Sequence, residues 1–184
     1  YLKQFPIDKY VDFVVNRQHS AWDWTQAEQH GKWIESAYLS AVQGDDKELL
    51  IKAESVLNRI IDSQEANGYV GATAKSFRSP ERPVRGMDAY ELYFVFHAFI
   101  TVYEETGDKK ALTAAEKLAD YFLQYFGPGK LEFWPSDLRA PENKQKHLDG
   151  HSDFAGHSVH YSWEGTLLCD PITRLYELTG KKKY

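Results

Sequence analysis

Three related passages recur along the chain, and they constrain its fold more than any other feature. Each is an apolar helical pattern that ends at a glycine and is followed by a charged stretch: "AYLSAVQGDDKELL" around Gly44, "TVYEETGDKKAL" around Gly107 and "TRLYELTGKKKY" around Gly180. Glycine readily takes the left-handed conformation that ends a helix, and an aspartate just after it, such as Asp45 or Asp108, can cap the next helix. The repeat therefore predicts helical hairpins with tight turns.

The two arms of each hairpin differ in their apolar pattern. Residues 87–105 have almost no polar face, whereas residues 109–126 set apolar side chains at helical spacing opposite lysines and acids. The first arm is therefore predicted to be an inner helix and the second an outer helix. Residues 32–42 and 47–64 repeat this contrast, so inner and outer helices alternate along the chain.

The connections from each outer helix back to the next inner helix are long, over residues 65–86 and 127–158. Loops of this length are uncommon in a compact domain unless they serve a function, and they must all lie at the end opposite the tight turns. This arrangement predicts an all-α fold, an (α/α) toroid of hairpins with its functional site at the loop end. We expect one domain over residues 1–184, about half of an (α/α)6 barrel, although an isolated right-handed stack of three hairpins is the alternative. The hairpins are expected near residues 25–66, 87–126 and 157–184.

The composition argues against some classes of binding partner. The 184 residues carry a net charge of −5, with no basic stripe for a phosphate backbone and no run of about 18 apolar residues, so neither nucleic acid nor a membrane is expected as a partner. Aromatic residues make 15% of the chain, which suits a heavy core or a surface that stacks sugars. Cys169 is the single cysteine, so there is no internal disulfide, and we predict that it is a small packed residue because no positive partner is evident nearby. The oligomeric state is not indicated.

The second predicted inner helix carries an unusual set of polar residues. Tyr90 and Tyr93 lie seven and four residues before His97, so the three share one stripe of the helix. If this stripe faces the barrel axis, a neutral imidazole could bond a sugar hydroxyl between tyrosine walls; otherwise His97 is a core histidine. Asp88 and Glu91 have capping-box spacing, so capping is predicted for Asp88. Glu91 lies about a third of a turn from the His97 stripe and could act only through a neighbour.

A histidine-rich stretch, residues 147–165, is the second candidate region. If residues 157–164 are helical, His157, His160 and Glu164 share one face, a spacing that could clamp a polyol or hold a metal. No motif as specific as His-Glu-x-x-His is present, so a sugar-binding loop is favoured and no metal ligand is assigned. Glu164 is the one catalytic candidate, and the sequence names no second catalytic group to act with it. Further candidates for substrate contact at the loop end are Asp149, His151, Trp163, Tyr69 and Trp24.

Two local features leave alternatives open. Asp170-Pro171 predicts an N-cap followed by proline at the first helical position, with a helix running to Leu178; one long helix kinked at Pro171 is the alternative. The "AWDW" passage that ends at Trp24 could equally anchor the first inner helix or stack on a ligand.

Several passages resemble the N-terminal part of the β-L-arabinofuranosidase-like glycoside hydrolases, glycoside hydrolase family 127 and its relatives. They are "GKWIESAYLSAV", "IDSQEANGYVGA", "MDAYELYFVFHAFITVYEETGDKKAL", "LADYFLQYFGPGK" and "LYELTGKKKY", spread over about residues 30–184. The most specific pieces are Glu91-Leu92-Tyr93 with His97 four residues on, and Gln64 with Asn67-Gly68-Tyr69.

This resemblance implies an (α/α)6 barrel that hydrolyses glycosides of plant polysaccharides, releasing L-arabinofuranose or a related sugar. It implies zinc beside a cysteine nucleophile in the full-length protein, with the nucleophile and the acid/base glutamate in later parts of the barrel, and it favours a periplasmic or secreted location. No cofactor is evident in this segment itself. His97 matches a histidine that lines the sugar pocket, and a second matching histidine is among His151, His157 and His160. Val95-Phe96 departs from the small residue and glycine that usually precede the first histidine, which leaves the sugar open.

The functional prediction is therefore a glycoside hydrolase segment that supplies pocket walls for a carbohydrate substrate. One alternative is a sugar epimerase on the same kind of barrel, with His97 and either His157 or His160 as the proton acid and base. The other alternative is a non-catalytic helical module that binds glycan or protein through its loop face.

Overall fold

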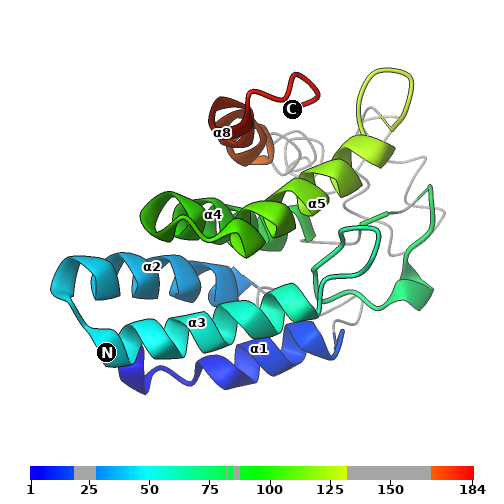
Figure 1. The fold of residues 1–184 in the computed structure, drawn as a ribbon. Coiled ribbons are helices and arrows are strands. Elements are labelled where there is room, and N and C mark those ends of the chain that lie inside the picture. Colours follow the sequence, from blue (N-terminus) through cyan, green and yellow to red (C-terminus); the bar gives the residue numbers. More distant parts are fainter. Residues whose placement is uncertain (19–27, 82, 85–87, 132–166) are drawn as a thin grey trace, which may run out of the picture.

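The computed structural model describes residues 1–18, 28–81, 83–84, 88–131 and 167–184. This part of the chain consists of helices and loops (Figure 1), and no strand occurs in it. The all-α prediction is therefore confirmed. The helices are η1 (Leu2–Gln4), α1 (Ile7–Val15), α2 (Glu28–Gly44), α3 (Lys47–Asp62), η2 (Lys75–Phe77), α4 (Asp88–Thr106), α5 (Lys109–Tyr125) and α8 (Cys169–Thr179).

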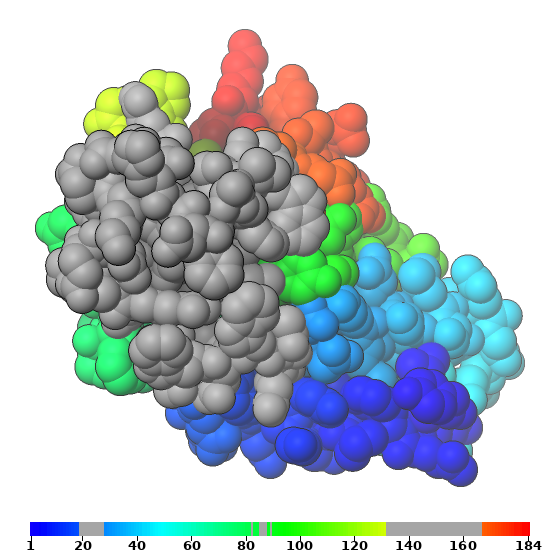
Figure 2. Space-filling view, turned by 180° about the vertical axis from the view of Figure 1, so that it is seen from behind, coloured from blue at the N-terminus to red at the C-terminus, as the bar shows by residue number. Residues whose placement is uncertain are grey.

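The inner helices α2, α4 and α8 run side by side. The most extensive helix contact is between α2 and α4, and α8 packs on the other side of α4. In the view from behind, α4 shows between α2 and the orange start of α8 (Figure 2). The outer helices α3 and α5 pack behind α2 and α4, each burying one apolar face. This is the alternation of inner and outer arms that the sequence predicts.

The first tight turn differs in detail from its prediction. Helix α2 ends at Gly44, but Asp45 is the residue in the left-handed region, with φ 47°. Asp46 then caps α3, because its Oδ1 accepts from Leu49 N at 3.1 Å. The turn is therefore one residue longer than the predicted glycine and aspartate pair.

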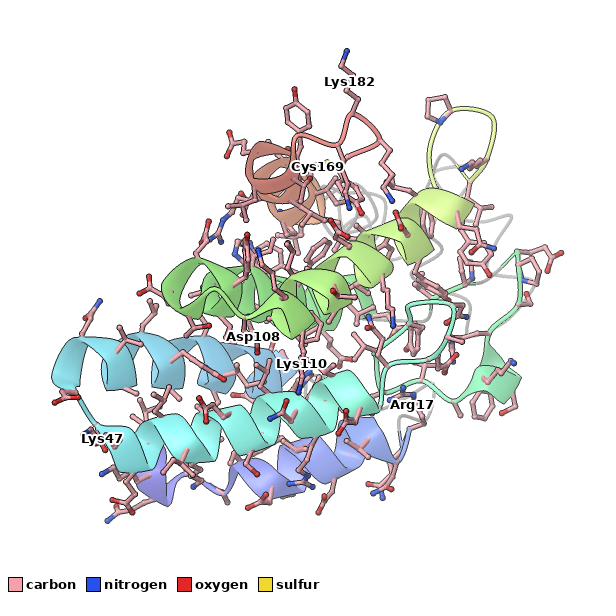
Figure 3. The ribbon with its side chains drawn as sticks, in the orientation of Figure 1. Arg17, Lys47, Asp108, Lys110, Cys169 and Lys182 are labelled. Atoms are coloured by element: carbon pink, nitrogen blue, oxygen red, sulfur yellow. The ribbon has the colours of Figure 1, made fainter. Side chains whose placement is uncertain are left out.

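The other two glycine turns follow the prediction. Gly107 has φ 73°, and Asp108 caps α5 by accepting from Lys110 N at 2.8 Å. Gly180 has φ 65° at the C-cap of α8, and its N–H donates to Tyr176 O at 2.7 Å. Lys47 lies at the turn between α2 and α3 in Figure 3, and Arg17 lies at the opposite end, beyond the end of α3.

Helix α1 was not predicted from the sequence. It is a nine-residue helix that packs on α2 and α3, with Ile7, Val11 and Val14 buried at helical spacing. Arg59 of α3 pairs with Asp8 and Asp12 on its outer side. Helix α1 thus covers apolar surface that the first hairpin leaves open.

Helix α8 begins at Cys169, with Leu168 as its N-cap, so the prediction that Asp170 is the N-cap is wrong. Pro171 is the third helical residue, which is acceptable because the first-turn N–H groups have no partner within the helix. Cys169 is exposed, so its prediction as a packed residue is also wrong. Its place at the start of α8 is seen in Figure 3. None of the helices described in the structure is long and apolar enough to cross a bilayer.

Candidate functional site

Helix α4 is buried on nearly every side except for one stripe. Tyr90, Tyr93, Phe94 and His97 are half-buried, whereas the apolar residues that follow on its other faces are fully buried. The Tyr93 and His97 rings meet edge to face with centroids 4.5 Å apart. Tyr93 therefore contacts His97 directly, whereas Tyr90 meets the Phe94 ring, with centroids 5.1 Å apart.

His97 contacts the first two turns of α8. Arg174 Nη1 lies 2.8 Å from His97 Nδ1, and Asp170 Oδ2 lies 2.8 Å from His97 Nε2, at an angle outside hydrogen-bond geometry. Arg174 also pairs with Glu104, two turns further along α4. Only 12% of the His97 side chain is exposed, compared with 58% for Asp170. His97 is therefore largely buried, and its two ring nitrogens lie against side chains of α8.

On the other side of the stripe, α2 contributes a charged edge. The Lys32 ammonium lies 4.3 Å from the Phe94 ring centroid and 3.0 Å from Glu28 Oε1. Thr101 Oγ1 donates to Glu35 Oε1 at 2.9 Å. In the sequence, a lysine and glutamates at these positions are typical of an ordinary solvated helix face, so nothing there indicates a site.

Tyr69 lies in the interior, away from this stripe. Its side chain has no exposed area, and its hydroxyl donates to the carboxylate of Asp88, 3.0 and 3.1 Å from the two oxygens. The same hydroxyl accepts from Thr73 N at 3.0 Å. Burial, followed by the charge of Asp88, raises the pKa of Tyr69 well above its usual value. The contacts therefore indicate a structural role for a residue predicted to contact substrate.

The capping prediction for Asp88 also needs correction. Asp88 is the first residue of α4 and not the residue before it, and its carboxylate also accepts from Thr73 Oγ1 at 3.1 Å. The carboxylate is completely buried, so these hydroxyl donors stabilise a charge that would otherwise be costly. Glu91 is buried too, on the side of α4 away from the His97 stripe.

A buried cation holds the connection between α3 and α4 over Tyr69. The Arg78 guanidinium carbon lies 3.6 Å from the Tyr69 ring centroid, its Nε donates to Thr73 O at 3.1 Å, and it pairs with Glu65. Arg17, at the end of α1, lies 3.6 Å from the same Glu65 carboxylate. The sequence gives no signal for this cluster, because its members come from four segments and no spacing connects them.

Gly68 is required at the start of this connection. Its φ is +100°, and a Cβ atom there would lie 2.0 Å from Lys117 O of α5. Gln64 Nε2 donates to Gly68 O at 2.9 Å and to Ala114 O at 3.0 Å, while Asn67 Oδ1 accepts from Tyr69 N at 3.1 Å. The Gln64 and Asn67-Gly68-Tyr69 piece thus docks the loop against α5.

Seven predicted site residues lie outside the described residues. They are Trp24, Asp149, His151, His157, His160, Trp163 and Glu164. Within the described residues, no group of three His, Cys, Asp or Glu side chains could hold a metal ion.

Adjacent inner helices backed by outer helices, with a polar and aromatic stripe on α4, define the chain as a segment of an (α/α) toroid. The family model described as the β-L-arabinofuranosidase GH127 catalytic domain matches residues 6–134. The chain therefore belongs to glycoside hydrolase family 127.

Known relatives agree with this membership. The non-reducing end β-L-arabinofuranosidase of Bifidobacterium longum subsp. longum is 26% identical over 160 residues, which cover 83% of this chain and 20% of that protein. The crystal structure of a GH127 β-L-arabinofuranosidase from Geobacillus stearothermophilus T6 shares the fold with a TM-score of 0.57 and 19% identity, covering 97% of this chain and 25% of that one. A second GH127 β-arabinofuranosidase structure matches with a TM-score of 0.59 and 22% identity, and the match covers 96% of this chain and 26% of that one. The chain thus spans about a fifth to a quarter of the length of these relatives.

Proposed function

We propose that the protein carrying this chain is a glycoside hydrolase that releases β-L-arabinofuranose from the non-reducing ends of glycans, and that this segment supplies part of the pocket wall. The observation that carries the proposal is the family match over residues 6–134, which includes the inner helix α4 and its Tyr93–His97 pair. An aromatic edge beside a carboxylate and a guanidinium suits a sugar, which offers apolar ring faces and hydroxyl groups.

The chemistry of hydrolysis needs an acid and a nucleophile or base on either side of the scissile bond. Glu164 remains the only candidate from the sequence, and it lies outside the described residues. Zinc beside a cysteine nucleophile is implied by the resemblance, but the described residues do not fit that role: Cys169 is exposed, and no three potential ligands gather around it. No step of the proposal therefore passes through zinc in this segment.

The proposal is tested by the turnover of 4-nitrophenyl β-L-arabinofuranoside by the complete gene product, beside the α-L-arabinofuranoside and a β-D-galactoside. We expect cleavage of the first substrate and its collapse in His97→Ala, with folding checked by circular dichroism. Lys47→Ala, at the turn end, is the control that should retain activity. Absence of cleavage of any arabinofuranoside would refute the proposal.

The mass of the product separates the two enzyme classes. A hydrolase adds water to its substrate, whereas an epimerase conserves mass and inverts a carbon centre through a proton acid and base. Sugar binding without turnover by the complete protein would instead favour a non-catalytic module.

The source of the substrate and the location of the protein are part of the same proposal. Plant-type glycans as the substrate source and export to the periplasm or the medium are both expected from the family resemblance. Release of arabinose from plant oligosaccharides and detection of the protein in fractionated cells are the measurements that test them.

A further inference from the structure

The contact between His97 and Arg174 determines which ring nitrogen carries the proton. A guanidinium group has five N–H donors and no acceptor. Because Arg174 Nη1 lies 2.8 Å from His97 Nδ1, that nitrogen must present its lone pair. A neutral His97 then carries its proton on Nε2, the nitrogen that lies 2.8 Å from Asp170 Oδ2.

Both ring nitrogens of His97 are consequently turned toward α8. The ring is largely buried, so it offers little surface to a ligand, whereas more than half of the Asp170 side chain is exposed. Among the described residues, the Asp170 carboxylate is contacted only through Oδ2, which leaves Oδ1 available as an acceptor. Asp170 is therefore the most exposed polar group of this cluster, since the Glu104 side chain is 36% exposed and that of Arg174 28%.

We propose that Asp170 accepts hydrogen bonds from hydroxyls of the substrate sugar, and that His97, whose tautomer Arg174 fixes, is the positioning residue that holds this carboxylate. The inference rests on the proposed function and names a sugar contact within the same site. His97 Nε2 lies 2.8 Å from Asp170 Oδ2 without hydrogen-bond geometry, so it fixes the carboxylate by contact and by electrostatic attraction, while Arg174 lies on the opposite ring nitrogen and is itself held by Glu104.

The surroundings of Asp170 suit a polyol. A carboxylate is an acceptor-only group, so it selects ligands that offer donors, and adjacent hydroxyls of a furanose ring can share its two oxygens. Tyr93 lies beside His97, and its hydroxyl is protonated at neutral pH and can act as a donor. Donor, acceptor and aromatic edge therefore lie together on the α4 and α8 side of the stripe.

The test compares Asp170→Ala and Asp170→Asn with Glu177→Gln in the complete gene product. Glu177 is an exposed carboxylate on the same helix and is the matched control. With 4-nitrophenyl β-L-arabinofuranoside, Asp170→Ala should raise KM roughly 10- to 100-fold, the usual effect of losing a hydrogen bond to a charged group. Asp170→Asn, which retains one carbonyl oxygen, should raise KM less, and Glu177→Gln should leave it unchanged. A KM for Asp170→Ala within twofold of the parent value would overturn the proposal. If the alanine variant does not fold, the KM of Asp170→Asn is compared with the parent value instead, and an unchanged KM overturns the proposal.

The role of His97 in positioning Asp170 is tested separately, by measuring which ring nitrogen carries the proton. In selectively ¹⁵N-histidine-labelled protein, with His97→Gln to assign the signals, Nδ1 of His97 should be unprotonated and Nε2 protonated at neutral pH. Arg174→Met, which removes the donors, should shift Nδ1 toward its protonated resonance as a second tautomer becomes populated. A protonated Nδ1 in the parent protein would overturn the assignment.

Failure of the proposed function is distinguishable from failure of this inference. If the parent protein cleaves no arabinofuranoside, its affinity for free monosaccharides is measured by calorimetry. A sugar that binds the parent and Glu177→Gln but not Asp170→Ala would support the contact with Asp170. Equal binding to all three proteins, or no binding to the parent, would reject it.

Discussion

Replacing Tyr69 by phenylalanine separates the structural role seen here from a role in substrate binding. The substitution removes one oxygen atom from a fully buried site. Two interactions are lost with it: the O–H donated to the Asp88 carboxylate, and the acceptor of Thr73 N. No water is expected to replace the hydroxyl, because the space that it leaves is smaller than a water molecule requires.

The magnitude follows from these two losses. A hydrogen bond to a charged group contributes about 1.5–3 kcal/mol, and a buried N–H left without an acceptor costs about 1–3 kcal/mol. Tyr69→Phe should therefore lower the free energy of unfolding by about 3–5 kcal/mol. Tyr103→Phe is the matched control, because that hydroxyl makes only an exposed bond with Lys109 Nζ at 3.3 Å, and its removal should cost less than about 0.5 kcal/mol.

The assay is urea denaturation of the complete protein followed by circular dichroism, together with KM at a temperature where each variant is folded. The structural reading requires a large loss of stability with KM close to the parent value. A stable Tyr69→Phe variant with a strongly raised KM would refute it and restore Tyr69 as a substrate contact. A double-mutant cycle with Asp88→Asn should give a coupling energy above about 0.5 kcal/mol, because the two groups are in direct contact.

Further substitutions test the turns and the buried tyrosines. Gly68→Ala should destabilise the protein by more than about 3 kcal/mol in urea, because a left-handed φ adds to a clash with Lys117 O. Asp108→Ala should lower the free energy of unfolding by about 1 kcal/mol, because it removes the cap of α5. Asp45→Gly should raise it by about 0.5–1 kcal/mol, because Asp45 has φ 47°. The urea midpoints of the two variants measure both changes. Burial raises the pKa of Tyr121 to about 12. The protonated hydroxyl therefore contributes its full stabilisation below a pH of about 10, and this contribution is lost as the pH rises through 12. Between pH 10 and 11.5, Tyr121→Phe should lose less stability than the parent protein.

The parts of the fold that the sequence predicted are those set by local pattern. Inner and outer helices differ in how many faces are apolar, and this difference can be read within one helix. The turns at Gly107 and Gly180 were predictable because glycine favours the left-handed conformation that both adopt. The turn after Gly44 was not, because Asp45 takes that conformation instead and two consecutive aspartates offer two possible caps.

The buried polar cluster could not be predicted from the sequence, for a physical reason. Arg17, Glu65, Arg78 and Asp88 are separated by up to about seventy residues, and their contacts exist only once α1, α3 and α4 have packed. Each of these residues alone reads as an exposed charge on a loop or at a helix end. The identification of Tyr69 as a candidate for substrate contact had the same origin, since a tyrosine in a turn is usually at least partly exposed.

The cluster and the His97 stripe are connected through the first residue of α4. Asp88 is fixed by Tyr69 and Thr73, and successive residues of a helix are rotated by about 100°. The rotational setting of Asp88 therefore fixes the direction in which Tyr93 and His97 point. A rotation of α4 by one residue would turn His97 away from α8 and break its contacts with Asp170 and Arg174. The segment of Gln64 and Asn67-Gly68-Tyr69, which docks on α5, thus helps to orient the Tyr93 and His97 side chains, although it does not contact them. If this is correct, Asp88→Asn should change the tautomer signal of His97 even in variants that remain folded, whereas Asp108→Ala, at the turn end, should leave that signal unchanged.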